Sequence, residues 1–133
     1  SPEEIAFPRS VNGMKKYIDG TTIYKKSTPI AVKGSLLYNH YVNKLGLSDK
    51  HRMIVDGDKI KFLHLIKPNP LGGIAGTDQV VAFPNDLPRE FKAEKFIDYD
   101  MQFEKSFLSP LKNILEIIGW QWEEVSSLEG FFV

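Results

Sequence analysis

Residues 35–66 read SLLYNHYVNKLGLSDKHRMIVDGDKIKFLHLI, in which one helical pattern is followed by one strand pattern. In the first part Leu37, Tyr41 and Leu45 recur at every fourth position, which is the spacing of one face of an α-helix. Gly46 follows at the place where a left-handed glycine commonly ends a helix. The segment therefore predicts a helix over residues 35–45.

The second part of this segment alternates as β-strands do. Residues 52–55 and 59–66 flank Asp56-Gly57-Asp58, and an Asp-Gly pair is typical of a short hairpin turn. A further short strand is predicted at residues 79–83. The chain is therefore expected to have an α+β fold, with helices packed against a small antiparallel sheet in a single domain.

The two ends of the chain carry different patterns. Prolines and glycines interrupt residues 1–31, which predicts irregular structure with one helical turn at residues 14–18. Apolar residues form a single stripe along residues 97–118, which predicts a long helix. Pro110 lies inside this stripe, and it lacks the backbone donor that a helix interior uses. Either a kink at Pro110 or a second helix beginning at Ser109-Pro110 fits the pattern.

Composition excludes several classes of protein. The 133 residues are 42% hydrophobic and contain no cysteine, which argues for a folded core and against disulfide frameworks, zinc fingers and thiol catalysis. No apolar run approaches the roughly 20 residues of a membrane span, and no signal peptide is recognised at the N-terminus. Nothing in the composition opposes a cytosolic setting, and no membrane partner is expected.

The formal net charge of zero conceals two unlike halves. Residues 9–67 hold twelve Lys and Arg against four acids, a net of +8, whereas residues 68–133 hold five against eleven, a net of −6. A basic half of this strength suits a phosphate backbone. A mixed-charge surface whose halves neutralise each other after folding fits equally well.

No self-contained catalytic site emerges from the motifs. Asp98-Tyr99-Asp100 resembles a metal-binding pair, but both acids fall where a helix is predicted to begin, and acids there favour the helix dipole. The three histidines share no metal-ligand spacing and no nucleophile. Metal sites and catalytic residues are therefore not assigned.

Binding chemistry is better represented. Five lysines lie among tyrosines and small polar residues near the N-terminus: Lys15, Lys16, Lys25, Lys26 and Lys33. Lysines of this kind make salt-sensitive contacts with phosphates without reading base sequence. The alternative is an ordinary solvated surface. The C-terminal residues Leu128, Phe131 and Phe132 could dock in a partner's apolar pocket or fold back on the chain itself.

Three blocks of the sequence resemble a known family. The blocks are residues 26–39 (KSTPIAVKGSLLYN), 61–70 (KFLHLIKPNP) and 97–111 (IDYDMQFEKSFLSPL). They resemble the thumb domain of the replicative family B DNA polymerases of T-even-like bacteriophages, including phages that infect cyanobacteria. The tail 127–132 (SLEGFF) is similar to the peptide by which these polymerases bind their sliding clamp. The resemblance spans nearly the whole chain but only the C-terminal part of a much longer enzyme.

This resemblance implies a function and a set of site residues. Residues 1–125 would form a DNA-binding domain that grips primer–template duplex, and residues 126–133 would bind the sliding clamp. Lys33 stands where many members have arginine, and Val125 stands where many clamp-binding peptides have glutamine. The DNA-binding candidates are Lys25, Lys26, Lys33, Asn39 and Lys105. The clamp-binding candidates are Leu128, Phe131 and Phe132.

The resemblance also bounds what the chain would do. The catalytic palm, the fingers and the exonuclease domain are outside this sequence, so no polymerase activity and no cofactor are expected of the chain alone. Mg²⁺ is expected only in the palm. The setting would be the cytoplasm of an infected bacterium, with the chain a split-gene subunit or a fragment. The alternatives are a stand-alone nucleic-acid or protein interaction module and, more remotely, a nuclease using Asp98 and Asp100.

Overall fold

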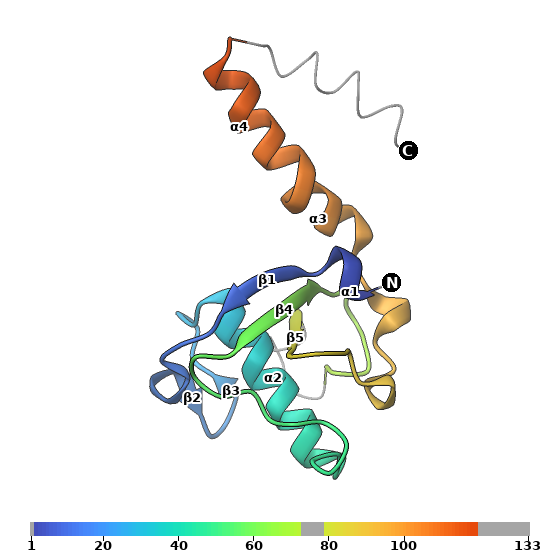
Figure 1. The fold of residues 1–133 in the computed structure, drawn as a ribbon. Coiled ribbons are helices and arrows are strands. Elements are labelled where there is room, and N and C mark those ends of the chain that lie inside the picture. The colour runs from blue at the N-terminus through green and yellow to red at the C-terminus, as the bar shows by residue number, and fades with distance from the viewer. Residues whose placement is uncertain (1, 73–78, 120–133) are drawn as a thin grey trace. The chain divides into compact units, whose positions relative to one another are not determined.

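The chain divides into two compact units, Ser1–Asp98 and Tyr99–Val133. The computed structural model describes residues 2–72 and 79–119 (Figure 1). The first unit contains a three-stranded antiparallel sheet, a two-stranded hairpin and one long helix, and the described part of the second unit is mainly helical. The predicted α+β fold with a small antiparallel sheet is confirmed.

The first unit is built on a sheet with strand order β1–β4–β5. Its strands are β1 (Phe7–Ser10), β4 (Lys59–His64) and β5 (Val80–Phe83). Both pairings are antiparallel, and the strand expected at residues 79–83 is confirmed as β5. The described part of the N-terminal segment also contains α1 (Pro2–Ile5) and the 3₁₀ turn η1 (Met14–Tyr17), which confirms the helical turn expected there.

The hairpin predicted between residues 52–55 and 59–66 is wrong in one of its strands. β4 forms as expected, but it pairs with β1 and β5, and residues 52–55 form no strand. The reason is that Ile54 uses its backbone groups elsewhere. Its N–H donates to Oδ1 of Asn39 at 2.8 Å, and its carbonyl accepts from Nδ2 of Asn39 at 2.9 Å. These groups are therefore not available for a ladder with β4.

Helix α2 (Ile30–Lys44) packs against β5. It begins five residues before the predicted start, because Pro29 takes an extended conformation and its carbonyl accepts the Lys33 N–H at 2.9 Å. Gly46 has φ +66° and closes the helix as predicted. The hydrophobic core forms between α2 and the sheet, and its largest fully buried side chains include Tyr38, Phe83 and Phe91.

Gly34 explains how closely α2 approaches the sheet. A Cβ atom added there would lie 2.9 Å from the Ala82 backbone nitrogen and 3.1 Å from the Val81 carbonyl carbon. Real Cβ contacts are essentially never as short as the first distance, and the second is tighter than nine in ten of them. The helix therefore rests directly on the backbone of β5, and this contact fixes which residues of α2 face outward.

The second unit contains three consecutive helical segments: α3 (Tyr99–Phe103), the π-helical turn η4 (Glu104–Leu108) and α4 (Ser109–Ile117). The long helix predicted over residues 97–118 is therefore interrupted, and Ile97 belongs to the core of the first unit. Pro110 sits in the first turn of α4. α4 therefore begins at Ser109, one of the two predicted alternatives, and the backbone before it stays helical because the wider π turn of η4 precedes Pro110.

Candidate nucleic-acid interface

Two lysines lie in the turn that leads into α2, and a third lies in the first turn of that helix. Lys25 and Lys26 follow β3 (Ile23–Tyr24) and are exposed. Lys33 is half-buried, and its Nζ lies 5.7 Å from the centre of the Tyr24 ring. A cation at this distance is attracted to the ring face. Tyr24 therefore restricts the position of the Lys33 ammonium.

Hydrogen bonds within and around the turn that carries Lys25 and Lys26 hold it in place. The Thr28 hydroxyl donates to the Lys25 carbonyl at 2.5 Å, and the Thr28 N–H donates to the same oxygen at 3.2 Å. The Lys25 N–H in turn donates to the Tyr17 carbonyl at 2.9 Å. Since Thr28 is buried, this turn has little freedom to move. The side chains of Lys25 and Lys26 therefore project from a backbone that these hydrogen bonds hold in place.

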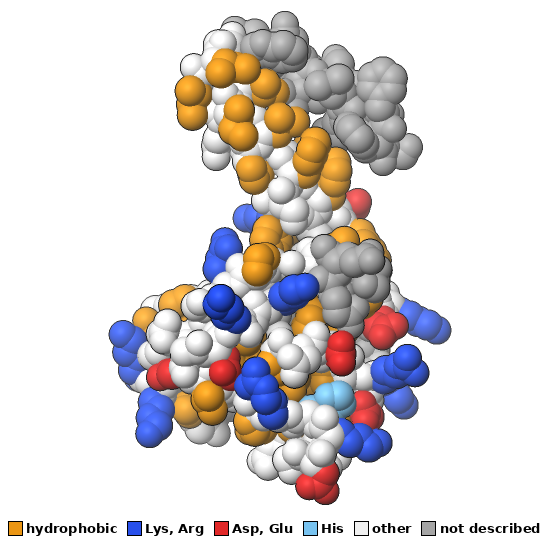
Figure 2. Space-filling view, in the orientation of Figure 1, with side chains coloured by type: hydrophobic (Ala, Val, Ile, Leu, Met, Phe, Trp, Pro, Cys, Tyr) orange, Lys and Arg blue, Asp and Glu red, His pale blue; other side chains and the backbone are white. Residues whose placement is uncertain are grey.

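A second pair of lysines belongs to the same region. Lys15 and Lys16 lie on η1, and the Lys16 Nζ is 5.4 Å from the centre of the Tyr17 ring. Tyr17 is the residue whose carbonyl holds Lys25, so η1 and the turn before α2 are linked. We call Lys15, Lys16, Lys25, Lys26 and Lys33 the lysine cluster. Figure 2 shows Lys and Arg side chains projecting from the first unit on the face in view.

Ion pairs among the described residues do not compensate the charge of the lysine cluster. None of its five members forms an ion pair within residues 2–72 and 79–119. Two acids lie in the same region: Asp56 Oδ1 accepts the Met14 N–H of η1 at 3.0 Å, and Asp19 accepts bonds from the Thr21 N–H at 2.8 Å and the Thr21 hydroxyl at 2.7 Å. The bonds from Thr21, followed by the charge of Lys25, lower the pKa of Asp19. Asp19 thus acts mainly on its own turn.

The beginning of α2 adds to this positive surface. Pro29 precedes the helix without a side-chain cap, and the first turn contains no acid. The positive end of the dipole of a 15-residue helix therefore stands beside Lys26 and Lys33. Helix dipole and lysine charge act in the same direction here, and both favour an anion.

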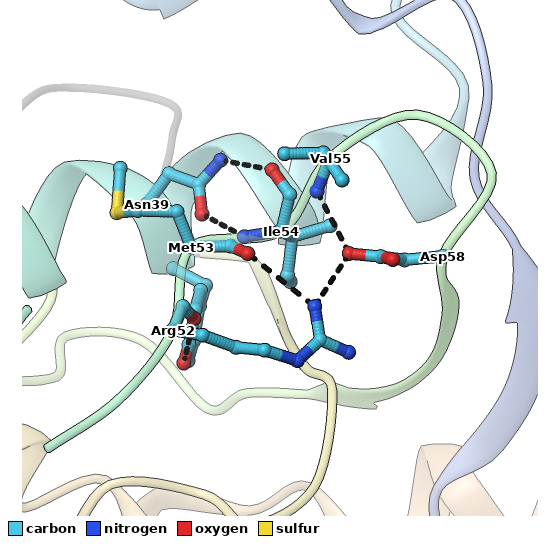
Figure 3. A network of polar contacts seen from close by, with 7 residues as sticks. Asn39, Arg52, Met53, Ile54, Val55 and Asp58 are labelled. Atoms are coloured by element: carbon cyan, nitrogen blue, oxygen red, sulfur yellow. Dashed lines mark hydrogen bonds and ion pairs between the residues drawn. The ribbon is translucent and has the colours of Figure 1, made fainter.

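Asn39 has a structural role in the fold (Figure 3). Its side-chain amide forms both the hydrogen bonds to Ile54 that replace a strand pairing. Its neighbour Tyr38 donates its hydroxyl to the Arg52 carbonyl at 2.7 Å, and burial raises the pKa of Tyr38 to about 12. The two residues thus attach the segment that follows α2 to the helix. The sequence block 26–39 could not reveal these partners, because they lie 14 and 15 residues further along.

An ion pair closes the same segment. Arg52 Nη1 lies 2.7 Å from Oδ2 of Asp58, and that oxygen also accepts the Val55 N–H at 2.8 Å. The Val55 N–H first, and then Arg52, lower the pKa of Asp58. Asp58 therefore organises the turn through which the chain enters β4. Its carboxylate also pairs with the guanidinium of Arg52.

The remaining predicted site residues belong to other parts of the chain. Lys105 is exposed on η4 and belongs to the second unit, which is described by itself. Leu128, Phe131 and Phe132 lie outside the described residues. Asp98 and Asp100 fall in different units, and Asp100 lies in the first turn of α3. Among the residues that the structure describes, no three His, Asp or Glu side chains gather as a metal site.

Comparison with known proteins relates the chain to DNA-directed DNA polymerases of phages. It is 34% identical over 133 residues to the DNA-directed DNA polymerase of Enterobacteria phage T4 and 29% identical over 133 residues to that of Escherichia phage RB69. Each alignment covers 96% of this chain. The chain spans about 14% of the length of these relatives. No protein-family model matches it.

These matches confirm the predicted resemblance to the T-even phage polymerases, and the chain aligns with a segment of each of these two enzymes. In the part of the chain that the structure describes, no helix is long and apolar enough to cross a membrane.

Proposed function

We propose that this chain is the thumb part of a T-even phage DNA polymerase, which grips primer–template duplex and tethers the enzyme to the sliding clamp. The observation that carries the proposal is the lysine cluster. Its five lysines lie on η1, in the turn before α2 and in the first turn of α2, and none of them forms an ion pair within the described residues. The relation to phage DNA polymerases supports DNA as the polyanion.

In this proposal the lysine cluster contacts phosphates and does not read bases. Lysine is a compact charge with no planar fork, so it attracts a phosphate without fixing its orientation. Such contacts position a duplex in a sequence-independent way. This suits a polymerase, which must hold every sequence that it copies. The thumb would keep the primer end in place and so raise processivity, without supplying chemistry.

Lys25, Lys26 and Lys33 are the proposed primary contacts, with Lys15 and Lys16 extending the same surface. Asn39 supports the proposal indirectly, because its bonds to Ile54 hold the segment after α2 in place. Lys105 would add a contact from the second unit, where it stands exposed on η4 and forms no ion pair within the described residues.

In this proposal the other domains of the polymerase supply the catalytic chemistry. The palm would hold the catalytic acids and Mg²⁺, and the palm, fingers and exonuclease domain would be partners of the thumb in the cytoplasm of the infected cell. The clamp contact rests on Leu128, Phe131 and Phe132, whose pattern is similar to the family's clamp-binding peptide. We expect no nucleotide incorporation by the purified chain.

Salt dependence tests the DNA grip. We expect the affinity of the chain for a primer–template duplex to fall steeply as the salt concentration rises. Replacing Lys33 by alanine should weaken binding to all sequences alike and reduce the slope of log affinity against log salt by about 1. Lys25→Ala and Lys26→Ala should each act in the same direction. The measurement is fluorescence anisotropy of labelled duplex over a series of salt concentrations.

Lys44→Ala is the matched control for these variants. Lys44 stands at the other end of α2, with its Nζ 5.4 Å from the centre of the Tyr41 ring, so it is a lysine beside a tyrosine outside the lysine cluster. Its replacement should leave the salt slope unchanged. Binding that is indifferent to salt, or equal slopes for Lys33→Ala and the parent, would contradict the DNA grip.

The clamp contact is tested separately. Deleting residues 128–133 should abolish binding of the chain to the sliding clamp of a T-even phage, as measured by surface plasmon resonance. The same deletion should leave the affinity for duplex DNA unchanged, because the lysine cluster is untouched. Clamp binding that survives the deletion would end the assignment of the tail without affecting the DNA proposal.

A further inference from the structure

The turn formed by residues 56–58 binds the segment that leads into η1. The Gly57 N–H donates to the Val11 carbonyl at 2.7 Å, and the Val11 N–H donates to the Asp58 carbonyl at 3.0 Å. Val11 is buried in the core of the first unit. Both backbone groups of a core residue are therefore held by this turn, two residues before Gly13 and the start of η1.

Asp56 extends this attachment to η1 itself. The first N–H groups of a helical turn have no partner within the turn, and a Ser, Thr, Asp or Asn side chain just before it commonly accepts one of them. Gly13 occupies that position in η1 and has no side chain to offer. Instead, Oδ1 of Asp56 accepts the Met14 N–H at 3.0 Å, from 42 residues further along the chain. Asp56 thus supplies the cap that the local sequence lacks.

Gly13 connects the start of η1 to the position of Lys16. Its φ is +68°, a conformation that L side chains rarely adopt. A Cβ atom added at Gly13 would lie 3.2 Å from Cε of Lys16 and 3.8 Å from its Nζ. The stem of Lys16 therefore lies over Gly13, with its Nζ 5.4 Å from the centre of the Tyr17 ring. The position of the Lys16 ammonium consequently depends on the position of η1.

The charge of Asp56 works against the lysine cluster, although its hydrogen bond supports it. An acid beside a basic surface lowers the positive potential that attracts a polyanion. Asp56 is exposed, and it forms no ion pair within the part of the chain that the structure describes. What Asp56 supplies to η1 is an acceptor oxygen, which an asparagine would supply as well.

We propose that Asp56 is a positioning residue of the lysine cluster, whose acceptor oxygen holds η1 so that Lys15 and Lys16 lie beside Lys25. This inference rests on the proposed DNA grip and adds to it a residue from another part of the chain. Tyr17, the last residue of η1, accepts the Lys25 N–H at 2.9 Å, so η1 adjoins the turn before α2. Asp56 acts through the lysines and does not itself contact DNA.

Two substitutions of Asp56 separate its hydrogen bond from its charge. Asp56→Asn and Asp56→Ala both remove the negative charge, but only Asp56→Asn keeps an acceptor oxygen. By fluorescence anisotropy with labelled duplex, we expect Asp56→Asn to bind at least as tightly as the parent. Asp56→Ala should bind more weakly, with a salt slope lower by about 1–2, because up to two phosphate contacts are lost. A charge effect alone would strengthen binding in both variants, and equal affinities of the two would overturn the proposal.

Asp49 provides the matched control. It is an exposed acid that follows the C-terminal end of α2, whereas the lysine cluster lies at the other end. Asp49→Asn and Asp49→Ala should have equal affinities for duplex. Far-UV circular dichroism and urea midpoints check that all four variants are folded in the assay. A difference between the two Asp49 variants as large as that between the two Asp56 variants would overturn the proposal.

A double-mutant comparison tests whether Asp56 acts through Lys15 and Lys16. In a chain that carries Lys15→Ala and Lys16→Ala, Asp56→Ala should have little further effect on the affinity for duplex, because Thr28 still holds the Lys25 carbonyl. General damage to the fold would weaken binding in that chain as well. An effect of Asp56→Ala that is undiminished there would overturn the proposal.

Hydrogen exchange of the Met14 amide, measured by NMR, gives a readout that needs no DNA. The Met14 amide should exchange about 5- to 10-fold faster in Asp56→Ala than in the parent or in Asp56→Asn. The Val11 amide bonds to the Asp58 carbonyl and should stay protected in all three. Equal protection of Met14 in Asp56→Ala and the parent would overturn the proposal. Failure of the DNA grip would appear differently, as a parent chain that shows no salt-dependent binding while Met14 still responds to Asp56→Ala.

Discussion

Lys33 and Gly34 are neighbours on α2 that serve different purposes. Gly34 is buried against the backbone of β5, and Lys33 is half-buried with its Nζ near the ring of Tyr24. Because the missing side chain of Gly34 allows the helix to rest on the strand, the rotation of α2 about its axis is restricted. The direction in which Lys33 projects therefore depends on Gly34.

Gly34→Ala should destabilise the chain, although alanine is the better helix former. Overpacking against Ala82 and Val81 should cost about 1–3 kcal/mol, against the roughly 1 kcal/mol that alanine gains over glycine in a helix. We expect a net loss of up to about 2 kcal/mol, measured by urea unfolding. Gly20→Ala is the control, since nothing lies within 4 Å of its added Cβ, and it should leave stability unchanged or slightly raised. A more stable Gly34→Ala chain would contradict the close contact.

Asp58 should make stability depend on pH. The bond from the Val55 N–H, followed by Arg52, lowers the native pKa of Asp58 below its ordinary value of 3.8. Its contribution is therefore fully present above the ordinary value and is lost as the pH falls through the lowered native pKa. Asp58→Asn should lower the urea midpoint at neutral pH, and the difference from the parent should shrink as the pH falls below 3.8.

Arg52→Gln supplies the comparison for Asp58. It removes the guanidinium but leaves the Val55 N–H, which is the larger cause of the lowered pKa. The pH-dependent difference should therefore be smaller for Arg52→Gln than for Asp58→Asn. A difference between Asp58→Asn and the parent that persists unchanged below the native pKa would show that the carboxylate charge is not the source.

The helical elements of the second unit adapt to one residue. In a regular helix the ring of Pro110 would press on the carbonyl of Ser106, four residues back. Here the Ser109 N–H donates instead to Glu104, five residues back, which is the bond of a π turn. The wider turn relieves the clash and allows helical backbone to continue from α3 through α4. The apolar stripe seen in the sequence is consequently shifted around the helix at η4.

Pro110→Ala should strengthen this helix. It restores a backbone donor and removes the reason for the π turn, so we expect more helical circular dichroism and a gain of about 1 kcal/mol. This is less than the full cost of an interior proline, because the π turn and the position in the first turn of α4 already accommodate Pro110. Ser109→Ala is the neighbouring control and should change the helical signal little. A loss of helical signal in Pro110→Ala would contradict this explanation.

At the scale of the whole molecule, charge follows the division into units. Residues 1–98 hold fifteen Lys and Arg against eleven acids, a net of +4, and residues 99–133 hold two against six, a net of −4. The boundary between the units therefore separates a basic part from an acidic part. Lys105 is a basic residue in the acidic part. The proposed DNA grip belongs mainly to the first unit, and the proposed clamp contact belongs to the second.

The first unit should fold without the second. Its core lies entirely within residues 6–97, and the Asp98 N–H still bonds to the His64 carbonyl at 2.9 Å. A fragment of residues 1–98 should unfold cooperatively in urea and retain salt-dependent DNA binding through the lysine cluster. A fragment of residues 1–88 lacks the buried Phe91 and Ile97 and should lose cooperative unfolding. An unfolded 1–98 fragment would contradict the separation into units.

Local patterns in the sequence identified the elements and the charged surface of this chain. Helix α2, strands β4 and β5 and the cap at Gly46 follow from periodicity and turn residues, which act within a few residues of one another. Residues 26–39 likewise carried the resemblance to phage polymerases that the sequence comparisons confirm. The lysines of the cluster were visible as a local density of charge.

Tertiary structure alone decided which segments pair. The sequence did not predict β1, because its four residues include a proline and show little alternation of apolar and polar side chains. It nevertheless replaces residues 52–55 as the partner of β4. That choice depends on Asn39, whose amide occupies the backbone of Ile54. Periodicity reports which face of an element is apolar, but not which distant group satisfies a backbone donor. Two groups that are far apart in sequence can compete for the same backbone donor only when the folded core brings both within hydrogen-bond distance of it.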